Sequence, residues 1–303
     1  MHQVSGQWQR GLLLSLTTAL LWGVLPLALK ALLTEMNAIS ISWFRFLSAA
    51  LLLFFWLRSR RQLPARRALQ GSGWKLLLIC VAGLVGNYLF YLWSIDKISA
   101  AGAQVLIQLA PLFLLLGSVW IFKEAFAPGQ WAGLAVFTTG LVLFFNQRLA
   151  DLAANPEFLP GALLMLIASI TWAAYALAQK SLLRKMNSPA IMMLIYIAAA
   201  VLLLPGVEMQ SAASLSVAGI LLLIFACLNT LLAYGAFAEA LAHWEASRVS
   251  ATLAVTPLVT IFSSELLAFF WPGSVVLEPL NAWSYLGALM VVLGSMAAAL
   301  LRR

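Results

Sequence analysis

Charged residues are scarce in this chain. Only 9% of its 303 residues are Asp, Glu, Lys or Arg, whereas 63% are hydrophobic. A soluble domain carries about 25% charged residues, so this chain has too few to cover its own surface in water. Its solvent must therefore be mostly lipid, and the composition predicts an integral membrane protein.

Histidine and cysteine are also rare, with two residues of each. Cys80 and Cys227 lie inside apolar runs, where cysteine behaves as a small buried hydrophobe. The sequence has no paired-Asp metal motif, no G-x-S-x-G elbow and no phosphate-binding loop. These absences disfavour a membrane-embedded enzyme and exclude ATP-driven pumping within the chain. Neither a metal site nor a cofactor is expected.

Long apolar runs are what the chain has instead. About 20 apolar residues cross a bilayer as a helix. The runs are continuously apolar and lack the alternation of a barrel strand. We therefore expect an all-α integral membrane fold with ten transmembrane helices, near residues 11–31, 38–57, 75–95, 99–121, 130–146, 161–180, 189–205, 216–240, 248–271 and 282–301.

Lys and Arg residues gather on one side of these ten expected helices. With the N-terminus inside, most of them fall in inner segments, including the basic stretch 58–67, and only Lys30, Lys97 and Arg148 fall outside. Because Lys and Arg are retained on the cytoplasmic side, both termini are predicted to be cytoplasmic. The net charge of +8 then serves contact with anionic headgroups, and nucleic acid is not expected as a partner.

The chain also contains an internal repeat. After a shift of 150 residues, five residues fall on residues of the same type: Gly11, Trp22, Lys30, Met36 and Asn37 on Gly161, Trp172, Lys180, Met186 and Asn187. Each half contains five expected helices, so the second half is inserted upside down relative to the first, an arrangement typical of transporters. The predicted organisation is a cytoplasmic tail (1–10) followed by repeats at 11–150 and 151–303.

Three segments carry a distinctive pattern: LLWGVLPLALK at 20–30, SWFRFLSAALLL at 42–53 and PLFLLLGSVWIFKEAFAPGQWAGLAVFTTGLVLFF at 111–145. They resemble the drug/metabolite transporter (DMT) superfamily, specifically its ten-helix branch of two EamA-type repeats. The second half departs from the pattern, because it lacks an acidic residue at the position equivalent to Glu124. The resemblance implies alternating-access transport of small metabolites, commonly amino acids or related compounds that leave the cell.

Polar and aromatic side chains in the middle of apolar runs are the candidates for a substrate site, since polar groups are costly there. Many recur at three- or four-residue spacing and so share a helix face. The candidate substrate-binding residues are Trp22, Asn87, Tyr91, Gln104, Gln108, Trp172, Tyr175 and Tyr234. The alternative for each is a helix–helix hydrogen bond, worth about 0.6 kcal/mol. We favour that alternative for the stripe Thr252, Thr256 and Thr260.

Prolines interrupt three of the expected helices. Pro26, Pro111 and Pro257 each remove an N–H and free a carbonyl, which makes them candidate hinges, with a static kink as the alternative. The glycines have a simpler interpretation. The pairs 133/140 and 287/294 are predicted to let helices pack closely.

Two charges are expected deep in the membrane. Arg45 and Glu265 each lie about 10 Å below the outer surface, so they are placed to pair. An ion pair that holds helices together is our first interpretation. In the alternative, Glu265 carries a coupling proton or Arg45 meets a substrate carboxylate.

These observations together predict a secondary transporter of the cytoplasmic (inner) membrane that exports small metabolites. Amino acids, aromatic ones included, are the first guess for the substrate, because the candidate residues combine aromatic faces with amides. A small-molecule substrate and membrane lipid are the expected partners, and a coupling proton and a homodimer stay open. A lipid-linked sugar flippase or a multidrug exporter of the same fold is the alternative within transport. A passive scaffold is disfavoured because it needs no inverted repeat.

Overall fold

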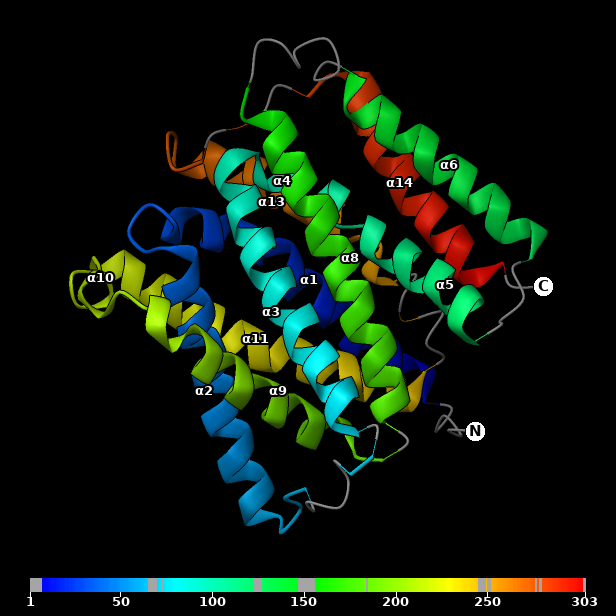
Figure 1. Cartoon of the computed structure of the whole chain (residues 1–303). Coiled ribbons are helices and arrows are strands. Elements are labelled where there is room, and N and C mark those ends of the chain that lie inside the picture. The colour runs from blue at the N-terminus through cyan, green and yellow to red at the C-terminus, as the bar shows by residue number, and fades with distance from the viewer. Residues whose placement is uncertain are drawn as a thin grey trace.

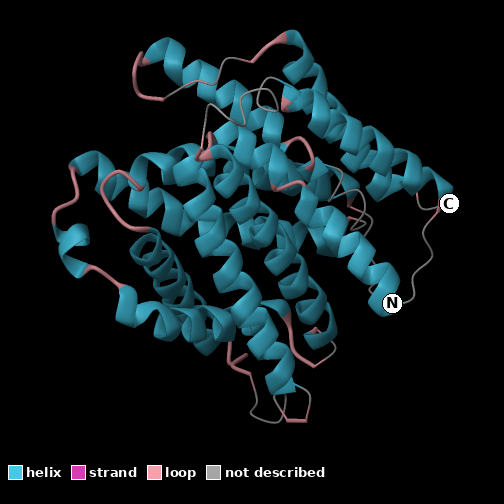
Figure 2. Ribbon diagram, turned by 45° about the horizontal axis from the view of Figure 1, so that its top comes forward, coloured by secondary structure: helices cyan, strands magenta, loops and turns pink. Residues whose placement is uncertain are grey.

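Helices make up all the regular structure that the computed structural model describes (Figures 1 and 2). The described residues are 7–64, 70–71, 73–122, 127–146, 156–183, 185–244, 249, 252–275, 277 and 280–301. No strand occurs among them. The prediction of an all-α fold is therefore confirmed.

The helices follow the expected apolar runs closely. In chain order they are α1 (Trp8–Leu32), α2 (Ala38–Ser59), α3 (Gly73–Lys97), α4 (Ala100–Leu106), α5 (Leu109–Phe122), α6 (Pro128–Phe144), α8 (Phe158–Leu182), α9 (Ser188–Leu203), η2 (Leu204–Gly206), α10 (Met209–Ala213), α11 (Val217–His243), α13 (Thr256–Phe270) and α14 (Ala282–Leu300). Six described helices are long and apolar enough to cross a membrane, namely α1, α2, α3, α8, α9 with η2, and α11. Four shorter apolar segments cover 100–114 (α4 and the start of α5), 128–144, 256–270 and 282–298.

Residues of the sequence repeat have matching local roles in the two halves. Asn37 is the N-cap of α2 and accepts a hydrogen bond from the Ser40 N–H, and Asn187 does the same for α9. Such a cap satisfies one N–H that the first helical turn leaves without a partner. The repeated Asn thus fixes where a helix begins in each half.

Close helix pairs build the molecule. α6 packs along α14 (upper right in Figure 1), α3 along α8, α1 along α11, and α2 along α9. Between α6 and α14 a Cβ on Gly133 would lie 2.5 Å from the Ala298 nitrogen, and one on Gly140 would lie 2.7 Å from the Val291 nitrogen. The prediction that these glycines allow close packing is confirmed.

Large apolar side chains cover much of the outer surface, as expected where a helix bundle faces lipid tails. Among these exposed side chains, the tryptophans lie near the ends of helices. Eight of the twelve tryptophans are exposed, and they lie in the first or last turns of helices or directly after them: Trp8, Trp56, Trp74, Trp93, Trp120, Trp131, Trp271 and Trp283. Membrane helices commonly place tryptophan there, at headgroup level.

Several residues that carried the sequence argument lie outside the described residues. They include Glu124 of the family pattern, Arg148 of the outer side, and Arg66 and Arg67 of the basic stretch.

Candidate functional site

Two of the expected helices are interrupted, which corrects the prediction of continuous runs at 99–121 and 248–271. The first run divides into α4 and α5 at Ile107 and Gln108, and in the second α13 begins only at Thr256. Proline explains both breaks. Pro111 and Pro257 lie in the first turn of the helix that follows the break, where a missing N–H does no harm.

The carbonyls that these prolines cannot bond find other partners. Pro111 has no N–H for the Ile107 carbonyl, which accepts from the Ala110 N–H at 2.9 Å instead. At the second break the Thr256 hydroxyl donates to the Leu253 carbonyl, four residues before Pro257. At both breaks, the carbonyl four residues before the proline therefore still accepts a hydrogen bond, and the local structure is stable.

Pro26 is different because α1 continues through it. It cannot bond the Trp22 carbonyl one turn back, and the side chain of Gln104 on α4 donates to that carbonyl at 3.4 Å. The flanking carbonyls of α1 also accept from other helices. Asn229 of α11 donates to the Leu21 carbonyl at 2.7 Å, and Thr260 of α13 donates to the Gly23 carbonyl at 2.6 Å. Three helices thus hold α1 at the turn that the proline weakens.

Four of the predicted site residues come together at this point. The Tyr91 hydroxyl donates to Gln104 Oε1 at 3.1 Å, which links α3 to α4. The Trp22 ring meets Tyr234 of α11 edge-on, with ring centroids 5.2 Å apart. Phe237 adds a third ring 5.8 Å from Trp22. We call Trp22, Tyr91, Gln104 and Tyr234 the Gln104 network.

Gln108 lies directly in the α4–α5 break. It is only 6% exposed. Its side-chain amide has no hydrogen-bond partner among the described residues. A buried amide of this kind has donors and an acceptor to offer to a ligand.

The other three predicted residues lie along α3 and α8. Asn87 donates to the Ala168 carbonyl at 3.0 Å, so its amide joins the two helices. The buried Tyr175 hydroxyl donates to Met192 Sδ at 3.2 Å. Trp172 is half-buried, with its ring 6.5 Å from that of Tyr175. In the described part of the chain no hydrogen bond or ring contact joins these residues to the Gln104 network, although Tyr234 and Trp172 pack against the same core cluster.

The ion pair expected between Arg45 and Glu265 is not present. Arg45 is 5% exposed, donates from Nε to Thr230 Oγ1 at 2.9 Å, and has its guanidinium over the Tyr88 ring, 4.4 Å from the ring centre. Glu265 is exposed and accepts a hydrogen bond from the Tyr285 hydroxyl. Equal depth along two helices did not bring the two side chains together, because their helices present them to different neighbours.

Glu265 instead lines a small cavity of about 100 Å³ with a mixed lining, whose polar members include Lys30, Ser99, Ser264 and Tyr285. The Lys30 ammonium donates to the carbonyls of Ile95 and Ile98 at 2.6 and 2.7 Å, where α3 ends. The sequence predicts Lys30 as an outer-side charge and as a residue of the repeat, and it predicts no contact for the ammonium group. Its conspicuous place at the end of an apolar run was the available signal.

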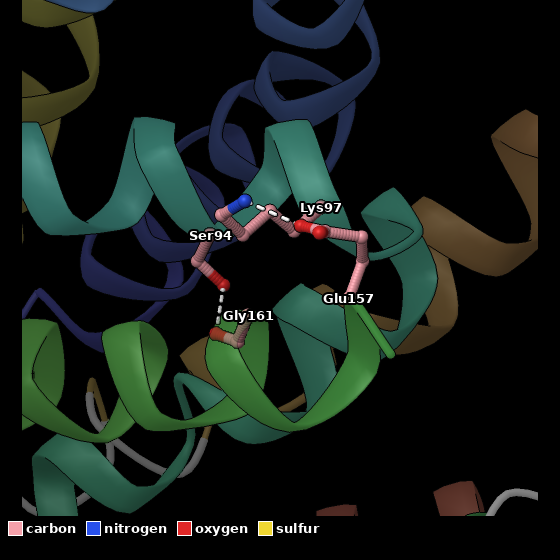
Figure 3. Close-up of polar contacts among 4 residues, drawn as sticks. All are labelled: Ser94, Lys97, Glu157 and Gly161. Carbon is pink, nitrogen blue, oxygen red and sulfur yellow. Dashed lines mark hydrogen bonds and ion pairs between the residues drawn. The ribbon is translucent and has the colours of Figure 1, made fainter. Parts of the chain in front are cut away.

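The ends of α3 and α8 are joined next to this cavity (Figure 3). Ser94 donates to the Gly161 carbonyl at 2.7 Å, and Lys97 forms an ion pair with Glu157. Ser94 therefore joins two helices. The same is true of Thr260, whose bond to α1 is described above.

Comparison with known proteins identifies the family. The chain matches the EamA-like transporter family over residues 9–146 and again over residues 159–300. It belongs to that family. Across 292 residues it is 39% identical to an uncharacterized inner membrane transporter of Escherichia coli K12, YhbE, with 96% of this chain and 91% of that one aligned. It is 37% identical over 290 residues to an uncharacterized transporter of Haemophilus influenzae, with coverage of 96% and 94%.

More distant relatives extend the comparison. The chain is 25% identical over 297 residues to a protein of Salmonella typhimurium described as a probable amino-acid metabolite efflux pump, with coverage of 93% and 92%. A crystal structure superposes with a TM-score of 0.65 at 19% identity and covers 98% of this chain and 99% of that one. At this identity the superposition shows a shared fold alone.

Proposed function

We propose that this EamA-family transporter moves small metabolites out of the cell across the inner membrane by alternating access. The observation that carries the proposal is the Gln104 network next to Gln108. The network offers the aromatic faces of Trp22, Tyr91 and Tyr234 and the hydrogen-bonded amide of Gln104. Gln108 adds an amide without a hydrogen-bond partner among the described residues. These groups lie where the interrupted α4–α5 segment meets α1 at the turn that Pro26 weakens. Interrupted helices with polar groups at the break form the binding sites of many secondary transporters.

The proposal includes ten spans in two inverted halves. The separate family matches to the two halves support it, as do the two proline breaks. The helix packing supports it as well. An inversion that relates α1 to α8 and α3 to α11 also relates the α3–α8 pair to the α1–α11 pair, and both pairs are extensive.

Pro26 is the hinge that the contacts favour most. The turn of α1 that it weakens bonds to α4, α11 and α13, so a movement of any of these helices acts on it directly. Pro111 and Pro257 are the other candidate hinges, because at each break one carbonyl has already exchanged its helical hydrogen bond for another contact. In this proposal Glu265 is a candidate carrier of a coupling proton.

A growth-protection screen tests the transport function. Cells with and without the protein are exposed to toxic amino-acid analogues, including aromatic ones, and to antimicrobial dyes. In a separate assay, the protein is tested for rescue of cells that lack a lipid-linked sugar flippase. Protection against amino-acid analogues supports the proposal. Protection against the dyes alone indicates a multidrug exporter, and rescue in the flippase assay alone indicates lipid-linked sugar transport.

Orientation has its own test. The charge asymmetry predicts that both termini and the basic stretch 58–67 are cytoplasmic. In a variant without native cysteines, a cysteine at Gln62 should escape an impermeant reagent added to intact cells. A cysteine at Ala153, which lies outside the described residues, should react. Labelling of position 62 from outside contradicts the orientation.

A further inference from the structure

Arg45 is a buried cation without an acidic partner in the described part of the chain. It lies where α2, α3 and α11 meet and is 5% exposed. Nε bonds to Thr230, and no described Asp or Glu forms an ion pair with the guanidinium. A buried guanidinium is normally paired, because removing its charge from water is expensive.

Three buried hydroxyls without hydrogen-bond partners accompany this charge. Among the described residues these are Ser42 Oγ, one turn before Arg45 on α2, and the Tyr196 hydroxyl of α9. The third is the Tyr88 hydroxyl, whose ring lies under the guanidinium and whose side chain interacts with Tyr234 but is not within hydrogen-bond geometry of it. Arg45 is near enough to Tyr196 to act on it electrostatically. Phe46 holds the two tyrosine rings in place, with ring centroids 4.4 Å from Tyr88 and 5.7 Å from Tyr196.

Unpaired buried polar atoms are few in folded proteins, and each needs an explanation. A group of them around one unpaired charge has a direct one, namely a ligand that brings the missing acceptor. We call Ser42, Arg45, Tyr88 and Tyr196 the Arg45 cluster. Arg45 also acts electrostatically on Tyr91 and Tyr234, so the cluster adjoins the Gln104 network.

We propose that the Arg45 cluster binds the carboxylate of the transported metabolite, an inference that rests on the transport function proposed above. The planar guanidinium fork matches the two oxygens of a carboxylate, and tyrosine and serine hydroxyls can donate to the same oxygens. One guanidinium balances one negative charge. The substrate class is therefore small organic monocarboxylates, amino acids included, whose apolar part lies against Trp22 and Tyr234.

Matched ligand pairs test the proposal on the purified full-length protein. Each pair consists of an acid and its amide: L-phenylalanine with L-phenylalaninamide, and 3-phenylpropionate with 3-phenylpropionamide. Further acid–amide pairs extend the panel. Thermal stabilisation measures binding. The acids should stabilise the wild-type protein and the amides should not. Equal stabilisation by acid and amide, or none by any acid, would overturn the proposal.

Variants assign the effect to the cluster. Arg45→Gln should weaken acid binding by about tenfold or more, the equivalent of one hydrogen bond to a charged group. Arg45→Lys keeps the charge without the fork, so it should retain part of the binding. Arg60→Gln, the same change at the exposed end of α2, is the matched control and should behave as wild type.

A second variant keeps the test decisive if Arg45→Gln does not fold. Tyr196→Phe removes a buried hydroxyl that has no hydrogen-bond partner among the described residues. It should leave the ligand-free protein as stable as wild type or more so, yet weaken binding of the acids. Unchanged acid binding in Tyr196→Phe and Ser42→Ala would overturn the proposal.

Uptake into proteoliposomes separates this inference from the proposed function. Arg45-independent transport of neutral compounds would refute the carboxylate site and leave the transporter intact. Arg45-dependent binding of acids that are never transported would support the site and refute the transport function.

Discussion

The α6–α14 pair and the Arg45 cluster use polar groups in opposite ways. Between α6 and α14 the polar side chains are paired: Gln130 donates to the Ala298 carbonyl at 2.9 Å and accepts from the Ala127 N–H, and Asn146 and Asn281 bond each other. In the Arg45 cluster three buried hydroxyls lack a hydrogen-bond partner among the described residues, and only Nε of the guanidinium donates a hydrogen bond there.

The difference shows that pairing, and not burial, distinguishes the two kinds of polar group in this protein. Gln130 is as buried as the residues of the Arg45 cluster, whereas Asn146 and Asn281 are half-buried. The polar groups between α6 and α14 are satisfied within the protein. In our proposal, the missing partner of the Arg45 cluster arrives with the substrate.

The largest expected effect is on the α6–α14 pair. Gly294→Leu should abolish folding or nearly so, because a side chain at Gly294 meets the backbone of Phe137 and can fit only if the helices separate. Overpacking of this kind costs about 3 kcal/mol or more. Fluorescence-detected size exclusion measures the folded fraction. Gly235→Leu is the control, since nothing lies within 4 Å of its Cβ, and equal folding of both variants would contradict the argument.

Loss of Gln108 should affect transport and leave folding unchanged. Its amide bonds nothing in the described protein, so Gln108→Ala removes only ligand contacts. We expect transport to fall about three- to tenfold, the equivalent of one or two neutral hydrogen bonds. Trp172→Ala should also reduce transport. Gln210→Ala, on exposed α10, is the control, and unchanged transport kinetics in both test variants would remove Gln108 and Trp172 from the site.

Glu265→Gln should give a well-folded protein, because Arg45 does not depend on Glu265 and a glutamine can still accept from Tyr285. The variant also tests proton coupling. If Glu265 carries the proton, transport driven by a pH gradient fails while substrate exchange continues. A fall in the amount of folded protein would instead show that Glu265 supports the structure.

The smallest expected effect concerns Glu35, between α1 and α2. Its carboxylate accepts from the Ser216 N–H and hydroxyl, at 2.7 and 2.8 Å, at the start of α11. The backbone bond is the main cause that lowers the pKa of Glu35 below its usual 4.5. Its contribution to stability is therefore present above pH 4.5 and lost as the pH falls through the lowered pKa.

Glu35 is only half-buried and lies near the surface, so Glu35→Gln should lower the melting temperature only slightly at neutral pH. Melting curves recorded against pH check this. The wild type and Glu35→Gln should converge in acid, and a constant difference at every pH would mean that the charge of Glu35 contributes nothing.

Local chemistry made part of this structure predictable. Asn37 and Asn187 cap α2 and α9, which is a common role of asparagine at a helix start. The close approach of α6 and α14 follows from the absence of a side chain at the repeated glycines. Pro26 was expected to free a carbonyl, and Gln104, chosen independently, is the group that bonds it. These are properties of one residue and the turn around it.

What the sequence could not supply was which helix faces meet. Arg45 and Glu265 were matched by depth, yet depth leaves the direction of a side chain around its helix open. Ser42, Tyr88 and Tyr196 were missed for the same reason, because they become a cluster only when α2, α3 and α9 are brought together. Tyr88 lies three residues before Tyr91, so the sequence predicts that the two share a helix face. It does not predict that Arg45 of α2 lies against Tyr88.

The tryptophans divide the intrinsic fluorescence of this protein into two populations. Eight indoles are exposed in or beside the end turns of helices, whereas Trp22, Trp43, Trp172 and Trp244 are buried or half-buried. Lipids with brominated acyl chains quench indoles that face the bilayer and leave enclosed ones emitting. The emission that survives such quenching therefore reports mainly on the interior, where Trp22 and Trp172 lie, and gives an optical signal for substrate binding that needs no added label.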